Sequence, residues 1–199
     1  MDLHRLGIKV FCAECGPLDL PELIPVFHRF IQGSSLEGLL IDVADYSHVH
    51  HGPGILLIAH EGNYALDGSA GRRGLVYYAK RRSGGTLAER LATVCRRAFM
   101  ACRTLAEQPE IDNRLVFSGE EIQLFANDRL LAPNTDRTLA VLRPALEALC
   151  DRLYRDRTWG ITRNGAEPER FSVTLRASAP TGIDDLLTHL AIGGPAGAA

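Results

Sequence analysis

The chain lacks any long apolar run, and this absence argues against a membrane-spanning protein at the outset. A transmembrane helix needs ~18 or more uninterrupted apolar residues, and here a charge, a glycine or a proline interrupts every run before that length. A strong excess of one charge sign is also lacking, because the chain has 24 Asp and Glu and 22 Lys and Arg, which gives a net charge of -2. With a pI of about 6.4, no overall charge draws the molecule toward nucleic acid or an anionic membrane. We therefore expect neither of them as a partner.

Lysine is scarce as well, since only Lys9 and Lys80 contribute to the 22 basic residues. The many arginines are scattered over ordinary solvated positions, which indicates genome composition rather than a binding surface. The five cysteines are an odd number and argue against a disulfide framework. The first residues, MDLHRLGIKVF, contain no secretory signal. Together these features predict a soluble protein in the reducing cytoplasm.

Hydrophobic periodicity predicts about three helices, and a capping box of Thr86 with Glu89 marks the start of the longest one. The expected helices cover residues 21–32, 86–108 and 135–154. The expected strands cover residues 7–11, 39–50, 55–67, 74–80, 159–163 and 170–177, with two more short strands inside 114–126. This order has hairpins and a β-meander instead of regular βαβ units. It predicts a single α+β domain over residues 1–192, with a mainly antiparallel sheet, helices packed on one face, and a flexible tail over 193–199.

Histidine is concentrated in one place, where four of the seven histidines occur within the segment DYSHVHHGPGILLIAHE. The glycines and proline of residues 51–54 predict a tight reversal between two strands. Histidine titrates nearest neutral pH and is the commonest metal ligand, so this hairpin is the first place to expect chemistry.

One hypothesis for the hairpin is a divalent metal site. His48 and His50 are two residues apart on a strand, so both imidazoles would point to one face, with Glu61 and Asp42 beside them. Such a metal could activate water, as in a metal-assisted hydrolase or a related enzyme. The competing interpretation is a set of solvated strand histidines without a metal.

A second hypothesis for the hairpin is a general-base dyad. If the loop is 51–54, antiparallel pairing sets Asp45 opposite His60 on the apolar side, where a carboxylate could orient an imidazole. The alternative is a buried polar pair that only fixes the register.

Near the turn of the hairpin we expect contacts to a small polar ligand. The expected contacts are Tyr46, His51, Gly52 and Gly54, because glycine allows a ligand to approach the backbone closely.

Two further functions stay open. The protein could be a non-catalytic homo-oligomer, with the polar hairpin face as a subunit contact. It could also be a dithiol redox protein, because Cys12 and Cys15 form a CxxC motif between a strand and a helix. The basic groups at Arg72, Arg73 and residues 80–82 bracket a strand that carries Tyr77 and Tyr78. Such groups could hold a phosphate-bearing ligand or single-stranded nucleic acid, but charges in these positions usually solvate the strand ends, and we favour that interpretation.

Overall fold

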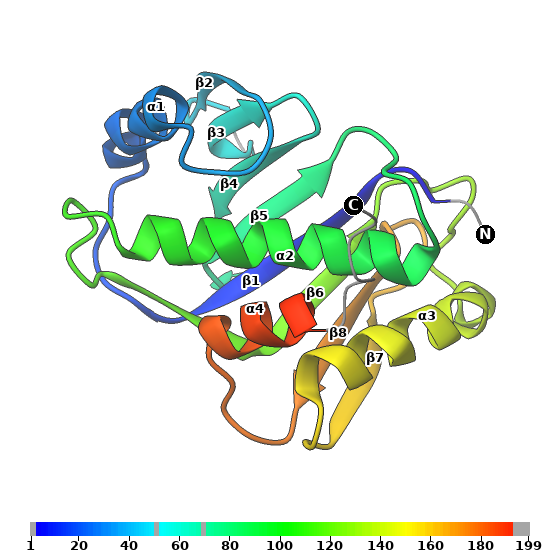
Figure 1. The fold of residues 1–199 in the computed structure, drawn as a ribbon. Helices are drawn as coiled ribbons and strands as arrows, with labels where there is room; N and C mark the ends of the chain where they lie inside the picture. Colours follow the sequence, from blue (N-terminus) through cyan, green and yellow to red (C-terminus); the bar gives the residue numbers. More distant parts are fainter. Residues whose placement is uncertain (1–2, 50–51, 69–70, 193–199) are drawn as a thin grey trace, which may run out of the picture.

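A computed structural model describes residues 3–49, 52–68 and 71–192, and within them the chain forms one eight-stranded sheet (Figure 1). Every neighbouring pair of strands is antiparallel, and the spatial order is β2-β3-β4-β5-β1-β6-β8-β7. The strands are β1 (Leu6–Cys15), β2 (Leu40–Tyr46), β3 (Gly54–Ala59), β4 (Gly62–Asp67), β5 (Gly74–Ala79), β6 (Leu115–Ala126), β7 (Trp159–Asn164) and β8 (Ser172–Ala177). The predicted α+β class with an antiparallel sheet is confirmed.

The helices lie on one face of this sheet, where α2 crosses β1 and β5 and packs against α3 and α4 (Figure 1). A 3-10 turn, η1 (Leu20–Glu22), leads into α1 (Leu23–Gly33), and α2 (Leu87–Ala106), α3 (Asp136–Tyr154) and α4 (Ile183–Ile192) follow. The described residues form four α-helices, one more than predicted, because α4 was not predicted from the sequence. In the part of the chain that the structure describes, no helix is long and apolar enough to cross a membrane.

Helix α2 begins where the capping box predicts. The Thr86 side chain accepts a hydrogen bond from the Glu89 amide, and the Glu89 carboxylate accepts one from the Thr86 amide at 2.7 Å. The helix buries a stripe that includes Leu91, Cys95 and Cys102 against the sheet. Its position fixes which sheet face is the core.

Alternation along each strand separates the core face from the opposite, open face. In β1, Ile8 and Val10 join the core, whereas Lys9 and Phe11 point to the other side. The open face is the sheet face opposite the helices. Its side chains on the other strands include Asp67, Glu121, Gln123, Phe125, Thr162, Thr174 and Arg176.

Several strand boundaries differ from the prediction, and β2 ends at Tyr46 rather than at residue 50. The segment 55–67 is two strands rather than one, because the chain reverses at His60 and Glu61 between β3 and β4. β6 is one irregular strand of 12 residues rather than two, since Gly119 donates to the carbonyl of Thr181 instead of turning back. β1 extends through Cys15 by means of bulges opposite β6, so the CxxC motif lies in a strand.

Candidate functional site

The register predicted for the histidine hairpin is wrong. β2 ends at Tyr46, which pairs with Gly54, so that Asp45 lies opposite Ile55. His60 follows the end of β3, where its amide donates to the carbonyl of Leu39 at 2.8 Å. Asp45 is exposed instead of buried, and its Oδ1 accepts hydrogen bonds from both the amide and the hydroxyl of Ser47. These bonds lower the pKa of Asp45, and the structure does not bring this carboxyl to His60.

The predicted metal ligands are also separated along the chain. His48 is exposed in the turn after β2, whereas Glu61 lies in the turn between β3 and β4 and packs against Gly38. Among residues 3–49, 52–68 and 71–192, no group of three or more His, Cys, Asp and Glu side chains could hold a metal ion. His50 and His51 lie outside the described residues, so metal binding at the tip stays a prediction.

The residues predicted to contact a ligand near the turn have structural roles or stay untested. Gly54 has a φ of +69°, which favours glycine at the start of β3. The Gly52 amide donates to the Val49 carbonyl and closes the turn. Tyr46 is 41% exposed at the end of β2, so it remains accessible.

The CxxC pair lacks one property of a reactive dithiol. Burial raises the pKa of the Cys12 thiol, and a hydrogen bond with Cys15 raises it further. Redox motifs usually lower the pKa of the attacking thiol, because the thiolate is the nucleophile. Both cysteines are free thiols, and Cys15 is the exposed one.

A concave region lies on the open face, at the end of the sheet formed by β6, β8 and β7. It encloses about 640 Å³. Cross-strand pairing builds its floor, since Glu121 on β6 lies opposite Arg176 on β8, which lies opposite Gly160 on β7. We call this region the open-face pocket. Its lining is Arg72, Glu121, Thr158, Trp159, Gly160, Thr162, Asn164, Thr174, Arg176, Ala177 and Ser178.

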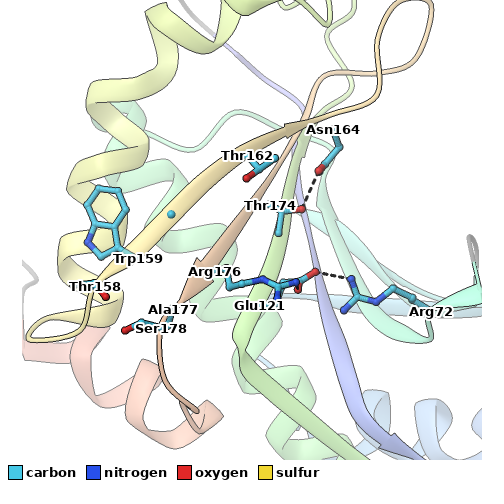
Figure 2. Close-up of a pocket in the computed structure, with 11 residues that line it drawn as sticks. Arg72, Glu121, Thr158, Trp159, Thr162, Asn164, Thr174, Arg176, Ala177 and Ser178 are labelled. Atoms are coloured by element: carbon cyan, nitrogen blue, oxygen red, sulfur yellow. Dashed lines mark hydrogen bonds and ion pairs between the residues drawn. The ribbon is translucent and has the colours of Figure 1, made fainter.

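Two arginines share one carboxylate in the open-face pocket. Arg176 and Arg72 approach Glu121 from opposite sides (Figure 2). Arg72 Nη1 lies 2.5 Å from Glu121 Oε1, and Arg176 Nη2 binds Glu121 Oε2. The Glu121 side chain is only 13% exposed, whereas those of Arg72 and Arg176 are 53% and 61% exposed. The three groups therefore carry one surplus positive charge, and it faces the pocket.

Neutral polar groups surround this charge. Thr162 and Thr174 form a cross-strand pair, and the Thr174 hydroxyl donates to Asn164 Oδ1 at 3.0 Å (Figure 2). Thr158 and Ser178 add hydroxyls near the end of the pocket marked by Trp159. Hydroxyls both donate and accept hydrogen bonds, so this rim suits a polar ligand.

Gly160 leaves the floor of the pocket open. A Cβ built at this position would meet nothing within 4 Å, and its φ is not in the left-handed region. The glycine is therefore required neither by backbone strain nor by close packing. Glycine weakens a strand, so space for a ligand is a physical reason for it at this position.

The sequence interpretation missed this pocket. Arg72 precedes β5, where solvation of the strand end was favoured over contact with a phosphate-bearing ligand, while Glu121 and Arg176 lie on strands that are far apart in the sequence but adjacent in the sheet. The available signal was the alternation in β8, which puts Thr174 and Arg176 on one face. Only the strand order adds Glu121 and Gly160 to them.

Comparison with known proteins adds no relative from which a function could be transferred. No protein-family model matches the chain, and neither the curated proteins nor the solved structures gave a match.

Proposed function

We propose that the protein binds a small anionic ligand in the open-face pocket. The observation that carries this proposal is the sharing of Glu121 between Arg72 and Arg176. One carboxylate cannot neutralise two guanidinium groups, and each guanidinium offers five N–H donors in a planar fork. A carboxylate or a phosphate group fits such forks in a bidentate manner.

Binding rather than catalysis is favoured by the residue types in the pocket. Its described lining contains no histidine, cysteine or lysine, and its one carboxylate is already engaged by both arginines. A general base or an activated nucleophile would need a partner that is free to take a proton. We therefore place the small polar ligand expected from the sequence in this pocket rather than at the histidine hairpin.

Filling the pocket tests this function. Gly160→Val adds a side chain that points into open space, and it suits a strand because β-branched residues favour one. Gly84→Val is the matched control, because a Cβ at Gly84 also meets nothing within 4 Å and this glycine lies outside the pocket.

The readout is the melting temperature in inorganic phosphate, compared with chloride at equal ionic strength. At ten times its Kd, phosphate stabilises a binding protein by about 1.4 kcal/mol. For a chain of this length that corresponds to a rise of roughly 3–6 °C. We expect this rise in the wild type and in Gly84→Val, and its loss in Gly160→Val. An equal rise in all three proteins would place phosphate outside the pocket.

Self-association is a second candidate, favoured by the exposed apolar side chains on and beside the edge strand β2. Leu39 is 63% exposed, Ile41 52% and Val49 44%. An edge strand presents unpaired main-chain groups, and two identical edges can pair antiparallel and satisfy both at once. A mass measurement by light scattering should show a dimer that Ile41→Lys dissociates. The control Val141→Lys, at a 51% exposed position on α3, should leave it intact. A monomeric wild type would remove this candidate.

A further inference from the structure

The open face carries two stacks in which an arginine lies over a phenylalanine. The guanidinium carbon of Arg72 is 3.8 Å from the ring centroid of Phe11, and that of Arg170 is 3.8 Å from the ring centroid of Phe125. Neither phenylalanine belongs to the core cluster on the helix side of the sheet. The first stack is part of the open-face pocket through Arg72, and the second lies outside it.

Phe125 is held firmly beneath Arg170. It pairs with Gly7 across the two strands, and a Cβ built on Gly7 would come within 2.2 Å of the ring. The ring therefore lies against the backbone of β1 at Gly7, where only glycine leaves room for it. A planar guanidinium stacked on a fixed ring keeps its N–H groups directed sideways, so they remain available for an anion.

Arg170 has no carboxylate of its own among the residues that the structure describes. No side-chain hydrogen bond or ion pair joins it to them, and its contact is with the Phe125 ring. Burial lowers the pKa of the Arg170 guanidinium below its ordinary value; the nearby carboxylate of Asp67 opposes this shift, and Arg129 adds to it. Asp67 is itself engaged by the ammonium of Lys9 at 2.6 Å.

The open face therefore carries an ion pair in the middle and arginines at both ends. Lys9 binds Asp67, the pocket at Glu121 has two arginines for one carboxylate, and Arg170 lies over Phe125. Glu121 and Phe125 are four residues apart on β6, which spans about 13 Å in a strand. Gln123 lies between them, and its side-chain amide donates to the hydroxyl of Ser172, which lies opposite Phe125, at 3.3 Å.

We infer that the Arg170 stack on Phe125 is a second anion subsite. The ligand of the open-face pocket is then an elongated molecule with an anionic group at each end, about 13 Å apart, and a polar middle. This inference rests on the proposed function, because the first anionic group occupies the pocket between Arg72 and Arg176. The two subsites differ in chemistry, since only the first contains a carboxylate.

The test uses alkane dicarboxylates of increasing length, from glutarate to dodecanedioate, and the matching monocarboxylates. Dodecanedioate, fully extended, reaches about the separation estimated from the strand. Binding is followed by amide chemical shifts of the full chain. Resonances of Gly160 and Thr174 report the pocket, and those of Gly7 and Phe125 report the second subsite.

We expect the affinity to rise about 10-fold from the monocarboxylate to the dicarboxylate that spans both subsites, because the second contact becomes intramolecular. Arg170→Gln should abolish this gain and the shifts at Gly7, yet leave monocarboxylate binding at Gly160. The control Arg143→Gln, on the exposed surface of α3, should keep the full gain.

Two other results would overturn the inference in distinguishable ways. Equal affinity for mono- and dicarboxylates of every length, with shifts confined to the pocket, would refute the second subsite and leave the proposed function standing. If neither subsite shows saturable shifts, the second subsite and the proposed function are both refuted.

Discussion

Replacing Glu121 with glutamine should make the protein less stable and a better anion binder. Glutamine has nearly the same shape but no charge, so Arg72 and Arg176 lose their shared partner and face each other as like charges. Because both arginines are more than half exposed, each pair is worth only 0.2–1 kcal/mol. We expect a loss of about 1 kcal/mol in the free energy of unfolding. At this chain length, that lowers the melting temperature by roughly 2–4 °C.

The same substitution raises the surplus charge in the pocket from one to two. An additional unit charge about 4 Å from a bound anion contributes about 1 kcal/mol in a water-like environment. Phosphate should therefore bind about 5-fold more tightly to Glu121→Gln than to the wild type. The stability loss should shrink in 1 M salt, where screening acts over about 3 Å.

Urea denaturation at low and high salt, together with a phosphate titration, measures both effects. Glu147→Gln is the control, since Glu147 pairs with Arg143 on the exposed surface of α3. Phosphate affinity that stays the same or falls in Glu121→Gln would refute the assignment of surplus positive charge to the pocket.

Three further predictions concern the rest of the molecule. The Tyr154 hydroxyl is buried without a hydrogen-bond partner among the described residues. Tyr154→Phe should therefore raise the free energy of unfolding, measured in urea titrations, by about 1–2 kcal/mol. A loss of stability would contradict this. Hydrogen bonds from Arg114 hold the pKa of Glu22 below its ordinary 4.5, so this contribution is present above pH 4.5 and lost as the pH falls through the lowered pKa. In Arg114→Gln, the free energy of unfolding should therefore fall less steeply as the pH is lowered below 4.5 than it does in the wild type. An equally steep fall in both proteins would contradict this role of Arg114. In a thiol titration of the native protein, the exposed Cys15 should react first and Cys12 slowly, because burial raises the pKa of Cys12; a fast phase that survives in Cys15→Ser would be inconsistent with this order.

The sequence predicts much of the fold because its strongest signals are local. The α2 capping box and apolar stripe lie within one helix, and the strands β5, β7 and β8 follow from short runs bounded by turn residues. The missed helix α4 is short, and it is fixed by contact with β6 at Gly119, where a Cβ would lie 2.6 Å from Leu186. The hydrophobic periodicity of a single segment does not reveal a contact between segments that are distant in the sequence.

The hairpin shows why register is harder to predict than strand existence. A reversal near Gly52 was predicted, but β2 ends at Tyr46, before the histidines, β3 begins at Gly54 rather than Ile55, and a second turn follows at His60. Each boundary error moves the opposing residue, so the expected partner of Asp45 changed from His60 to Ile55.

The open-face pocket depends on strand order, which local patterns leave undetermined. Glu121, Arg176 and Gly160 come from three strands, and Arg72 joins them from the segment before β5. No spacing in the sequence links these residues. Histidine is concentrated at the hairpin, but the described residues there form no comparable cluster of groups.

The most direct test of anion binding is a phosphate titration of the isotopically labelled wild type, followed at the amides of Gly160, Thr162, Thr174 and Arg176. We predict saturable shift changes at these four amides, which lie on β7 and β8, two of the three strands that form the pocket floor. The same titration should leave the resonances of α1 unmoved, because that helix packs against β2 at the far end of the sheet. Shifts that never saturate, or that spread evenly over all exposed arginines, would contradict a built anion site.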